Sequence, residues 1–281
     1  MHGSGGGKSW TRGIRAAALA AALLLAAALA APGCGGGGEA GGEGEGGPGP
    51  AADMASGRFR PAVGSAYRYH YRTAGPEEME GVPVNFPLEG DWDFTAQEGD
   101  KELTVTVVEP SSAPGAGRFP AAELCFKDES AGDTVYRYYV QDEKARRLLG
   151  TYIQSEGGRE SWDSYSPPLT VLAFPLAPGD TLEEEASYSN SEGYSYSITH
   201  RLTVLGMGAV RVPAGEFPLA VLIQDYEMSG NEAGYSTRIS YRWYVPGVGQ
   251  VASITSLPGE TQAAFNRASS FRWLLSYEQA R

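Results

Sequence analysis

The sequence predicts an all-β protein whose strongly curved antiparallel sheet closes partly or completely into a barrel. From residue 58 to residue 281, apolar residues alternate with polar ones at a period of two, which is typical of half-buried strands. Helical periodicity is nearly absent. The strands predicted in the second half are long, and long strands twist and curl when many lie side by side. A two-sheet sandwich is the alternative architecture.

Each predicted strand has one face suited to a core and one suited to solvent. The tyrosine-rich segment 67–71 opens the series, and Trp92 and Phe94 then alternate with Asp91 and Asp93. Gly, Pro, Asn and Asp occupy the gaps between strands, because Pro presets φ and Gly accepts positive φ in turns. The later alternating runs are 103–107, 136–140, 194–204, 217–223 and 235–243.

Residues 58–281 are expected to form a single β domain. Sandwiches and barrels of this length are common, and no break in composition divides the segment. The junction Ser166-Pro167-Pro168 is the one place where two halves of a bent sheet could meet.

Residues 1–33 have the composition of an export signal. A cationic start is followed by an apolar run over 16–31 that is too short to span a bilayer comfortably, and a small-residue cleavage site precedes Cys34. The tripeptide Ala31-Pro32-Gly33 before this cysteine resembles the lipobox of bacterial lipoproteins, which implies that Cys34 is lipidated. An ordinary secretory signal and an uncleaved signal anchor are the alternatives, and all three place the folded part outside the cytoplasm.

Residues 34–57 are predicted to be a flexible tether. They are almost wholly Gly, Ala, Glu, Pro and Asp, and Met54 is the single bulky apolar side chain. Such a chain spans roughly 25 Å, so the domain would be held just off a membrane by the acyl chains on Cys34. Two acyl chains suffice for stable anchoring.

The charge balance excludes a nucleic-acid partner. Loss of Lys8, Arg12 and Arg15 with the signal lowers the net charge of −12 by three, to −15. A chain this acidic repels polynucleotides and anionic headgroups.

The second half of the chain contains three motifs rich in proline and glycine: Phe174-Pro175-Leu176-Ala177-Pro178-Gly179-Asp180, Val212-Pro213-Ala214-Gly215-Glu216-Phe217 and Trp243-Tyr244-Val245-Pro246-Gly247-Val248-Gly249-Gln250-Val251. Together they resemble the motifs of an uncharacterised family of exported bacterial β-proteins. The resemblance covers residues 169–277 and implies an envelope β-protein, without implying a chemistry.

No catalytic, metal or cofactor site is predicted from the sequence. After the signal only two histidines remain, His70 and His200, and neither belongs to a nucleophile or zinc motif. Both are interpreted as structural. Cys125 is interpreted as an inert thiol that is at least partly buried, because no cationic cluster stands beside it.

The leading functional hypothesis is a non-enzymatic, lipid-anchored envelope protein that binds a protein partner or an apolar ligand on its aromatic-rich sheet. The carrier form of this hypothesis predicts an apolar hollow of several hundred Å³. The alternative is an extracytoplasmic glycan hydrolase that uses paired carboxylates among Asp91, Asp93, Asp163 and Glu183 to Glu185. A spacer that acts through strand pairing at an exposed edge is a third possibility.

Overall fold

The computed structural model describes residues 60–74, 81–99, 101–130, 132–231 and 234–280. These residues form β-strands and two short 3-10 helices, and no helix in these ranges is long and apolar enough to cross a membrane. The helices are η1 (Pro110–Ser112) and η2 (Ala116–Arg118). The strands are β1 (Ala66–Thr73), β2 (Val82–Pro83), β3 (Trp92–Asp93), β4 (Lys101–Val108), β5 (Leu124–Glu129), β6 (Asp133–Gln141), β7 (Ala145–Ser155), β8 (Glu160–Ala173), β9 (Thr181–Asn190), β10 (Ser195–Val212), β11 (Gly215–Asn231), β12 (Gly234–Val245), β13 (Gly249–Ser256) and β14 (Arg267–Glu278).

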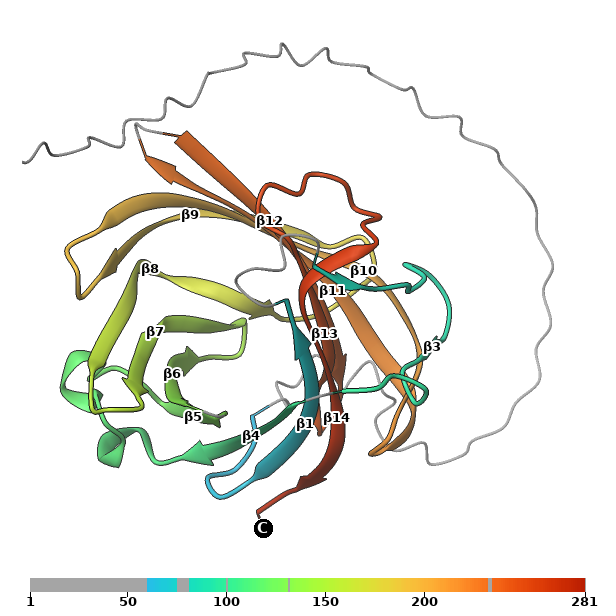
Figure 1. Ribbon diagram of the computed structural model, residues 1–281, viewed down its shortest axis with the longest axis horizontal. Coiled ribbons are helices and arrows are strands. Elements are labelled where there is room, and N and C mark those ends of the chain that lie inside the picture. The colour runs from blue at the N-terminus through green and yellow to red at the C-terminus, as the bar shows by residue number, and fades with distance from the viewer. Residues whose placement is uncertain (1–59, 75–80, 100, 131, 232–233, 281) are drawn as a thin grey trace, which may run out of the picture. The chain divides into compact units, whose positions relative to one another are not determined.

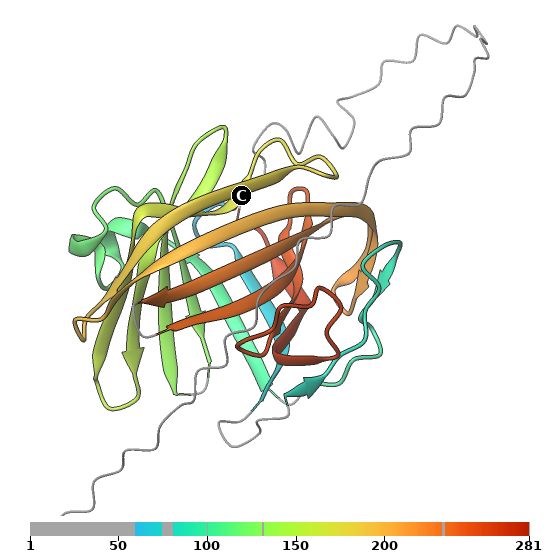
Figure 2. The same cartoon turned by 90° about the horizontal axis from the view of Figure 1, so that it is seen from above.

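Twelve of the strands form a closed antiparallel barrel. β1 pairs with β4, each strand from β4 to β14 pairs with the next, and β14 pairs back with β1 (Figure 1). The predicted curved sheet is therefore confirmed and its closure is complete, whereas the sandwich alternative is wrong. Figure 2 shows how the long β10 and β11, coloured gold to orange, bend around the wall. β2 adds to β14, and β3 runs parallel to β10.

The register fixes which side chains face the lumen, because partner residues in an antiparallel pair share one face of the sheet. On β12, Arg242 and Tyr244 line the cavity that the barrel encloses. Tyr241 and Trp243 alternate with them and face outward, together with their β13 partners Ile254 and Ala252. The wall is thus polar and aromatic inside and apolar outside along these strands.

A covering segment, residues 81–99, lies against the outer face of β10 to β14 (Figure 1, teal). The ring of Trp243 contacts those of Phe86, Trp92 and Phe94, with centroids 5.8, 6.0 and 4.9 Å apart. The sequence prediction of a strand around Trp92 and Phe94 holds only for Trp92 and Asp93. Both aromatic residues are nevertheless buried, because they cover a sheet from outside.

The ladder between β8 and β9 is interrupted. It joins Asp163–Ser166 to β9 and stops before Pro167 and Pro168, which have no N–H to donate. Beyond the prolines, the backbone N–H and the hydroxyl of Thr170 donate to the carboxylate of Glu184 on β9, the hydroxyl at 2.9 Å. At this seam a side chain replaces the strand-to-strand bonds.

Candidate binding site

The barrel encloses a cavity of about 520 Å³. Its walls come from β1, β4 to β8 and β12 to β14, so it is the interior of the closed ring. The hollow expected for a carrier is present, but its lining is a mixture of apolar and polar side chains and is not wholly apolar. Tyrosines and arginines supply much of it: Tyr67, Tyr69, Tyr71, Tyr139, Tyr244, Arg137, Arg146, Arg242 and Arg272.

The cavity lining carries four arginines and one carboxylate, that of Asp128. Asp128 binds Arg137, its neighbour across the β5–β6 pair. Arg242 binds Asp225 of β11, a buried carboxylate in the adjoining wall. Burial lowers the pKa of each of these two guanidinium groups, but the paired carboxylate reverses the effect and raises it.

The two other arginines each contact a neutral polar group. Arg272 donates to the hydroxyl of Ser253 at 2.9 Å, and its guanidinium lies 5.3 Å from the ring centroid of Tyr69. With its amide oxygen turned toward Arg272, Gln250 accepts from Nε at 2.9 Å. Arg146 donates to the Gln141 amide oxygen at 2.7 Å, and burial lowers the pKa of Arg146.

Two lumen tyrosines differ in how their hydroxyls are satisfied. Tyr69 donates to the carbonyl of Gln250 at 2.7 Å. The hydroxyl of Tyr67 is buried and has no hydrogen-bond partner among the described residues. Burial raises the pKa of Tyr67 to about 12, so its phenol keeps its proton at neutral pH. Tyr67 thus lines the cavity and carries an unsatisfied donor buried in the wall.

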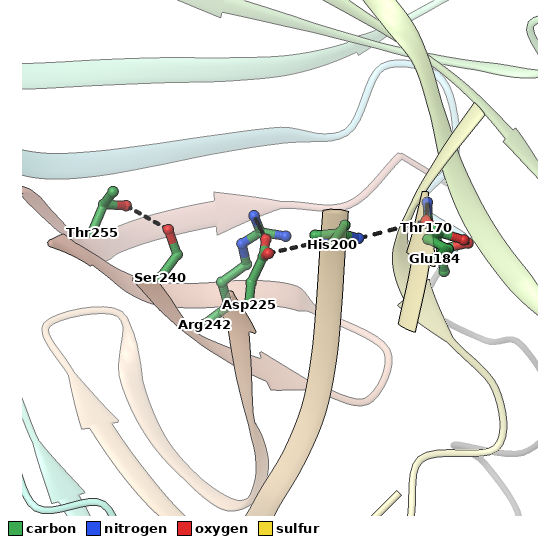
Figure 3. Close-up of polar contacts among 7 residues, drawn as sticks. All are labelled: Thr170, Glu184, His200, Asp225, Ser240, Arg242 and Thr255. Atoms are coloured by element: carbon green, nitrogen blue, oxygen red, sulfur yellow. Dashed lines mark hydrogen bonds and ion pairs between the residues drawn. The ribbon is translucent and has the colours of Figure 1, made fainter. Parts of the chain in front are cut away.

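A buried polar network crosses the wall beside the cavity (Figure 3). His200 of β10 is 1% exposed, and its Nε2 lies 2.6 Å from Asp225. Its Nδ1 lies 3.5 Å from Glu184 of β9. Because Glu184 also binds Thr170 and Asp225 binds Arg242, the network joins five consecutive strands, β8 to β12.

The charges in this network stabilise one another. Burial alone would lower the pKa of His200, but Asp225 and Glu184 raise it to about 9, so the imidazole is protonated at neutral pH. Burial alone would raise the pKa of both acids, but Arg242 and His200 hold that of Asp225 below its usual value. His200 and Thr170 do the same for Glu184. The interpretation of His200 as a structural residue agrees with this geometry.

The acids of the hydrolase alternative are dispersed. Asp91 and Asp93 are exposed on the covering segment outside the barrel, where Asp91 accepts from the N–H of Ala209 at 2.9 Å and Asp93 from the hydroxyl of Thr95 at 2.6 Å. Asp163 lies on the lumen face of β8 and accepts from Tyr188 at 2.6 Å. The hydrolase alternative stays a prediction, and the structure does not bring these three carboxylates together.

The glutamate run on β9 divides between the two faces of the wall. Glu183 and Glu185 are exposed. Glu184 points to the lumen side and binds Thr170 and His200. Alternation on β9 explains the difference, since residue 184 shares its face with Leu182 and Ala186.

Other predicted residues have simpler outcomes. Cys34, the predicted lipidation site, and the tether 34–57 lie outside the described residues. Cys125 is a fully buried free thiol, as expected, and burial raises its pKa to about 12. His70 lies on the outer face near Glu102, with 3.6 Å between Nε2 and the carboxylate. Within the described ranges, no cluster of three or more His, Cys, Asp or Glu side chains is placed to hold a metal ion.

Comparison with known proteins identifies two structural relatives at low similarity. No family model matches the chain, and no curated protein matches it. A presumed exported protein with YmcC-like fold from Bacteroides fragilis is 12% identical, with 79% of this chain and 98% of that chain covered and a TM-score of 0.39. A presumed lipoprotein from Parabacteroides distasonis is 11% identical, with 79% and 99% covered and a TM-score of 0.40. At these TM-scores neither relative contributes to the functional conclusion.

Proposed function

We propose that this chain is a non-enzymatic, lipid-anchored protein of the bacterial cell envelope whose barrel lumen binds a small amphiphilic ligand. The observation that carries the proposal is the cavity of about 520 Å³ inside the closed barrel. Ligand sites typically occupy about 300–1,000 Å³ and combine apolar walls with a few polar groups. The export signal, Cys34 and the tether support an extracytoplasmic location.

The lining suits a ligand with both apolar and polar parts. Phe126, Leu103 and Val105 offer an apolar surface, while the arginines and tyrosine hydroxyls offer hydrogen-bond donors. A wholly apolar ligand would leave the Tyr67 hydroxyl unsatisfied, which costs free energy in a buried site. The ligand of the leading hypothesis is therefore refined from apolar to amphiphilic.

A protein partner has less support from the surface. Only three large hydrophobic side chains among the described residues are exposed: Val63, Tyr194 and Tyr235. Protein-binding surfaces usually present contiguous apolar patches.

Mass spectrometry of the native protein tests the proposal. The full chain is expressed with its signal, purified from membranes and extracted with organic solvent, and the extract is compared with that of a Ser253→Trp variant. Ser253 lines the cavity, so the indole would fill the site and remove the bound molecule. Ser195→Trp, at an exposed position, is the matched control and should retain it.

Equal extracts from the native protein and a folded Ser253→Trp variant would contradict lumen binding. The same measurement reports the mass of the N-terminal peptide. An unmodified Cys34 with residues 1–33 still attached would contradict the lipid anchor.

A further inference from the structure

We propose, building on the proposed function, that the lumen selects amphiphiles with an anionic head, a carboxylate or a phosphate monoester, held by Arg272 and Arg146 with the phenol of Tyr67. All three side chains line the cavity.

The side chains that line the lumen include more positive than negative charges. In a chain with net charge −12, the cavity lining gathers four guanidinium groups and one carboxylate. The ion pairs of Arg137 with Asp128 and of Arg242 with Asp225 neutralise two of the cations within the wall. The charge of Arg272 is left without a carboxylate partner among the described residues, and a charge removed from water is stabilised by an opposite charge.

Arg272 lies among neutral side chains. Among the described residues no carboxylate lies within 4.0 Å of it, and its neighbours Ser253, Gln250 and Tyr69 are neutral. A guanidinium presents several N–H donors in a fixed plane and binds carboxylate or phosphate through two of them. Arg272 thus retains the charge and the geometry that such a head requires.

Tyr67 contributes a hydroxyl group that lacks an acceptor within the described ranges. Its buried hydroxyl is a donor without an acceptor among the described residues, and a buried donor left unsatisfied costs about 1–3 kcal/mol. Tyr67 and Arg146 both line the cavity. An anionic oxygen near Arg146 would accept the hydrogen bond that Tyr67 lacks.

The chemistry of the lining also excludes other heads. A cationic head would meet four arginines, and Asp128, the one carboxylate of the lining, is already paired with Arg137 through one of its oxygens. A neutral head would satisfy the phenol but leave the charge of Arg272 without a counter-ion. The apolar tail would contact Leu103, Val105, Phe126, Leu148 and Val171.

Binding of matched short-chain amphiphiles tests the inference. The full-length lipidated protein in nanodiscs is titrated with octanoate, octyl phosphate, octanol and octyltrimethylammonium, and ligand binding is measured from the shift in melting temperature. Empty nanodiscs give the partitioning blank. We expect octanoate or octyl phosphate to bind about 10-fold or more tightly than octanol, because a charged hydrogen bond is replaced by a neutral one. The cation should not bind.

Arg272→Gln is the decisive variant. It should weaken binding of the anions by about 10- to 100-fold and leave octanol binding unchanged, which also shows that the lumen is intact. Arg159→Gln, at a side chain 74% exposed in the β7–β8 turn, removes the same charge outside the lumen and should change neither. If Arg272→Gln does not fold, Tyr67→Phe should still weaken anion binding several-fold.

The outcomes separate the two proposals. Equal binding of octanol and octanoate, with no effect of Arg272→Gln or, where that variant does not fold, of Tyr67→Phe, would overturn the anionic head while lumen binding stands. Preference for the cation would also overturn it. Failure of every amphiphile to bind, together with empty extracts, would overturn both. The ratio of octanoate to octyl phosphate affinity distinguishes a carboxylate ligand from a phosphate one.

Discussion

The two faces of β12 differ in what they contribute to the molecule. On the outer face, Tyr241 and Trp243 are fully buried against the aromatic residues of the covering segment 81–99. On the inner face, Arg242 and Tyr244 line a cavity and join ion pairs and hydrogen bonds. The comparison teaches that a closed barrel can place a large part of its apolar packing outside the ring and keep charged and polar side chains inside it.

Substitution on the outer face should have the largest effect on stability. Trp243→Ala would remove the indole that three aromatic rings contact and should lower the free energy of unfolding by about 3–5 kcal/mol. Denaturant unfolding of the native and variant proteins measures it. Tyr235→Ala, at a side chain 74% exposed, is the control and should change stability by less than about 0.5 kcal/mol. Equal effects of the two variants would refute the outer core.

On the inner side, His200 should make stability depend on pH. Its pKa is raised to about 9 from an ordinary value of 6.5. A raised pKa gives a contribution that is complete below pH 6.5 and is lost as the pH rises through about 9. The loss amounts to about 3 kcal/mol. Denaturant unfolding between pH 6 and 10 should show this decline in the native protein and not in His200→Gln. Parallel curves for the two proteins would contradict the ion pair.

The stability of the interrupted pairing between β8 and β9 should depend on Glu184 and not on Glu183. Glu184→Gln keeps the shape but removes the charge facing His200 and Thr170, and should cost about 1–2 kcal/mol. Hydrogen exchange of residues 169–173 should become faster. Glu183→Gln, at an exposed neighbouring position, should leave exchange unchanged. Equal exchange in both variants would mean that the side chain does not close the seam.

The smallest expected effect separates ligand binding from stability. Tyr67→Phe removes a buried hydroxyl that has no partner, so the free energy of unfolding should rise by about 1 kcal/mol even though anion binding weakens. Tyr69→Phe removes a hydroxyl that donates to Gln250 and should lower stability by about 1 kcal/mol. Thermal unfolding without ligand compares the two. Destabilisation by Tyr67→Phe would show that its hydroxyl already has an acceptor.

Much of the fold could be predicted because strand alternation is a local property of the sequence. The runs at 67–71 and 235–243 are strands, and the predicted curvature is the closed barrel. Alternation does not say which face turns inward when both faces carry aromatic residues, as Trp243 and Tyr244 do. It also does not reveal that Trp92 covers the barrel from outside, since that contact joins residues distant in sequence.

The sequence contains a local signal for the buried charged side chains beside the cavity. Glu184, His200 and Asp225 occupy lumen-facing positions in otherwise apolar alternation, and charged residues at such positions indicate buried partners. Which partners they meet depends on register between strands, because His200 and Asp225 are 25 residues apart. The arginines that line the cavity come from four different strands, so no single motif contains them.

The covering segment affects which substitutions inside the barrel the protein can accept. Because Phe86, Trp92 and Phe94 anchor the wall from outside, substitutions that re-line the interior touch contacts separate from that anchor. Mutations far apart and without shared partners combine nearly additively. The residues that line the interior of the barrel can therefore be substituted while the contacts of the covering segment are retained.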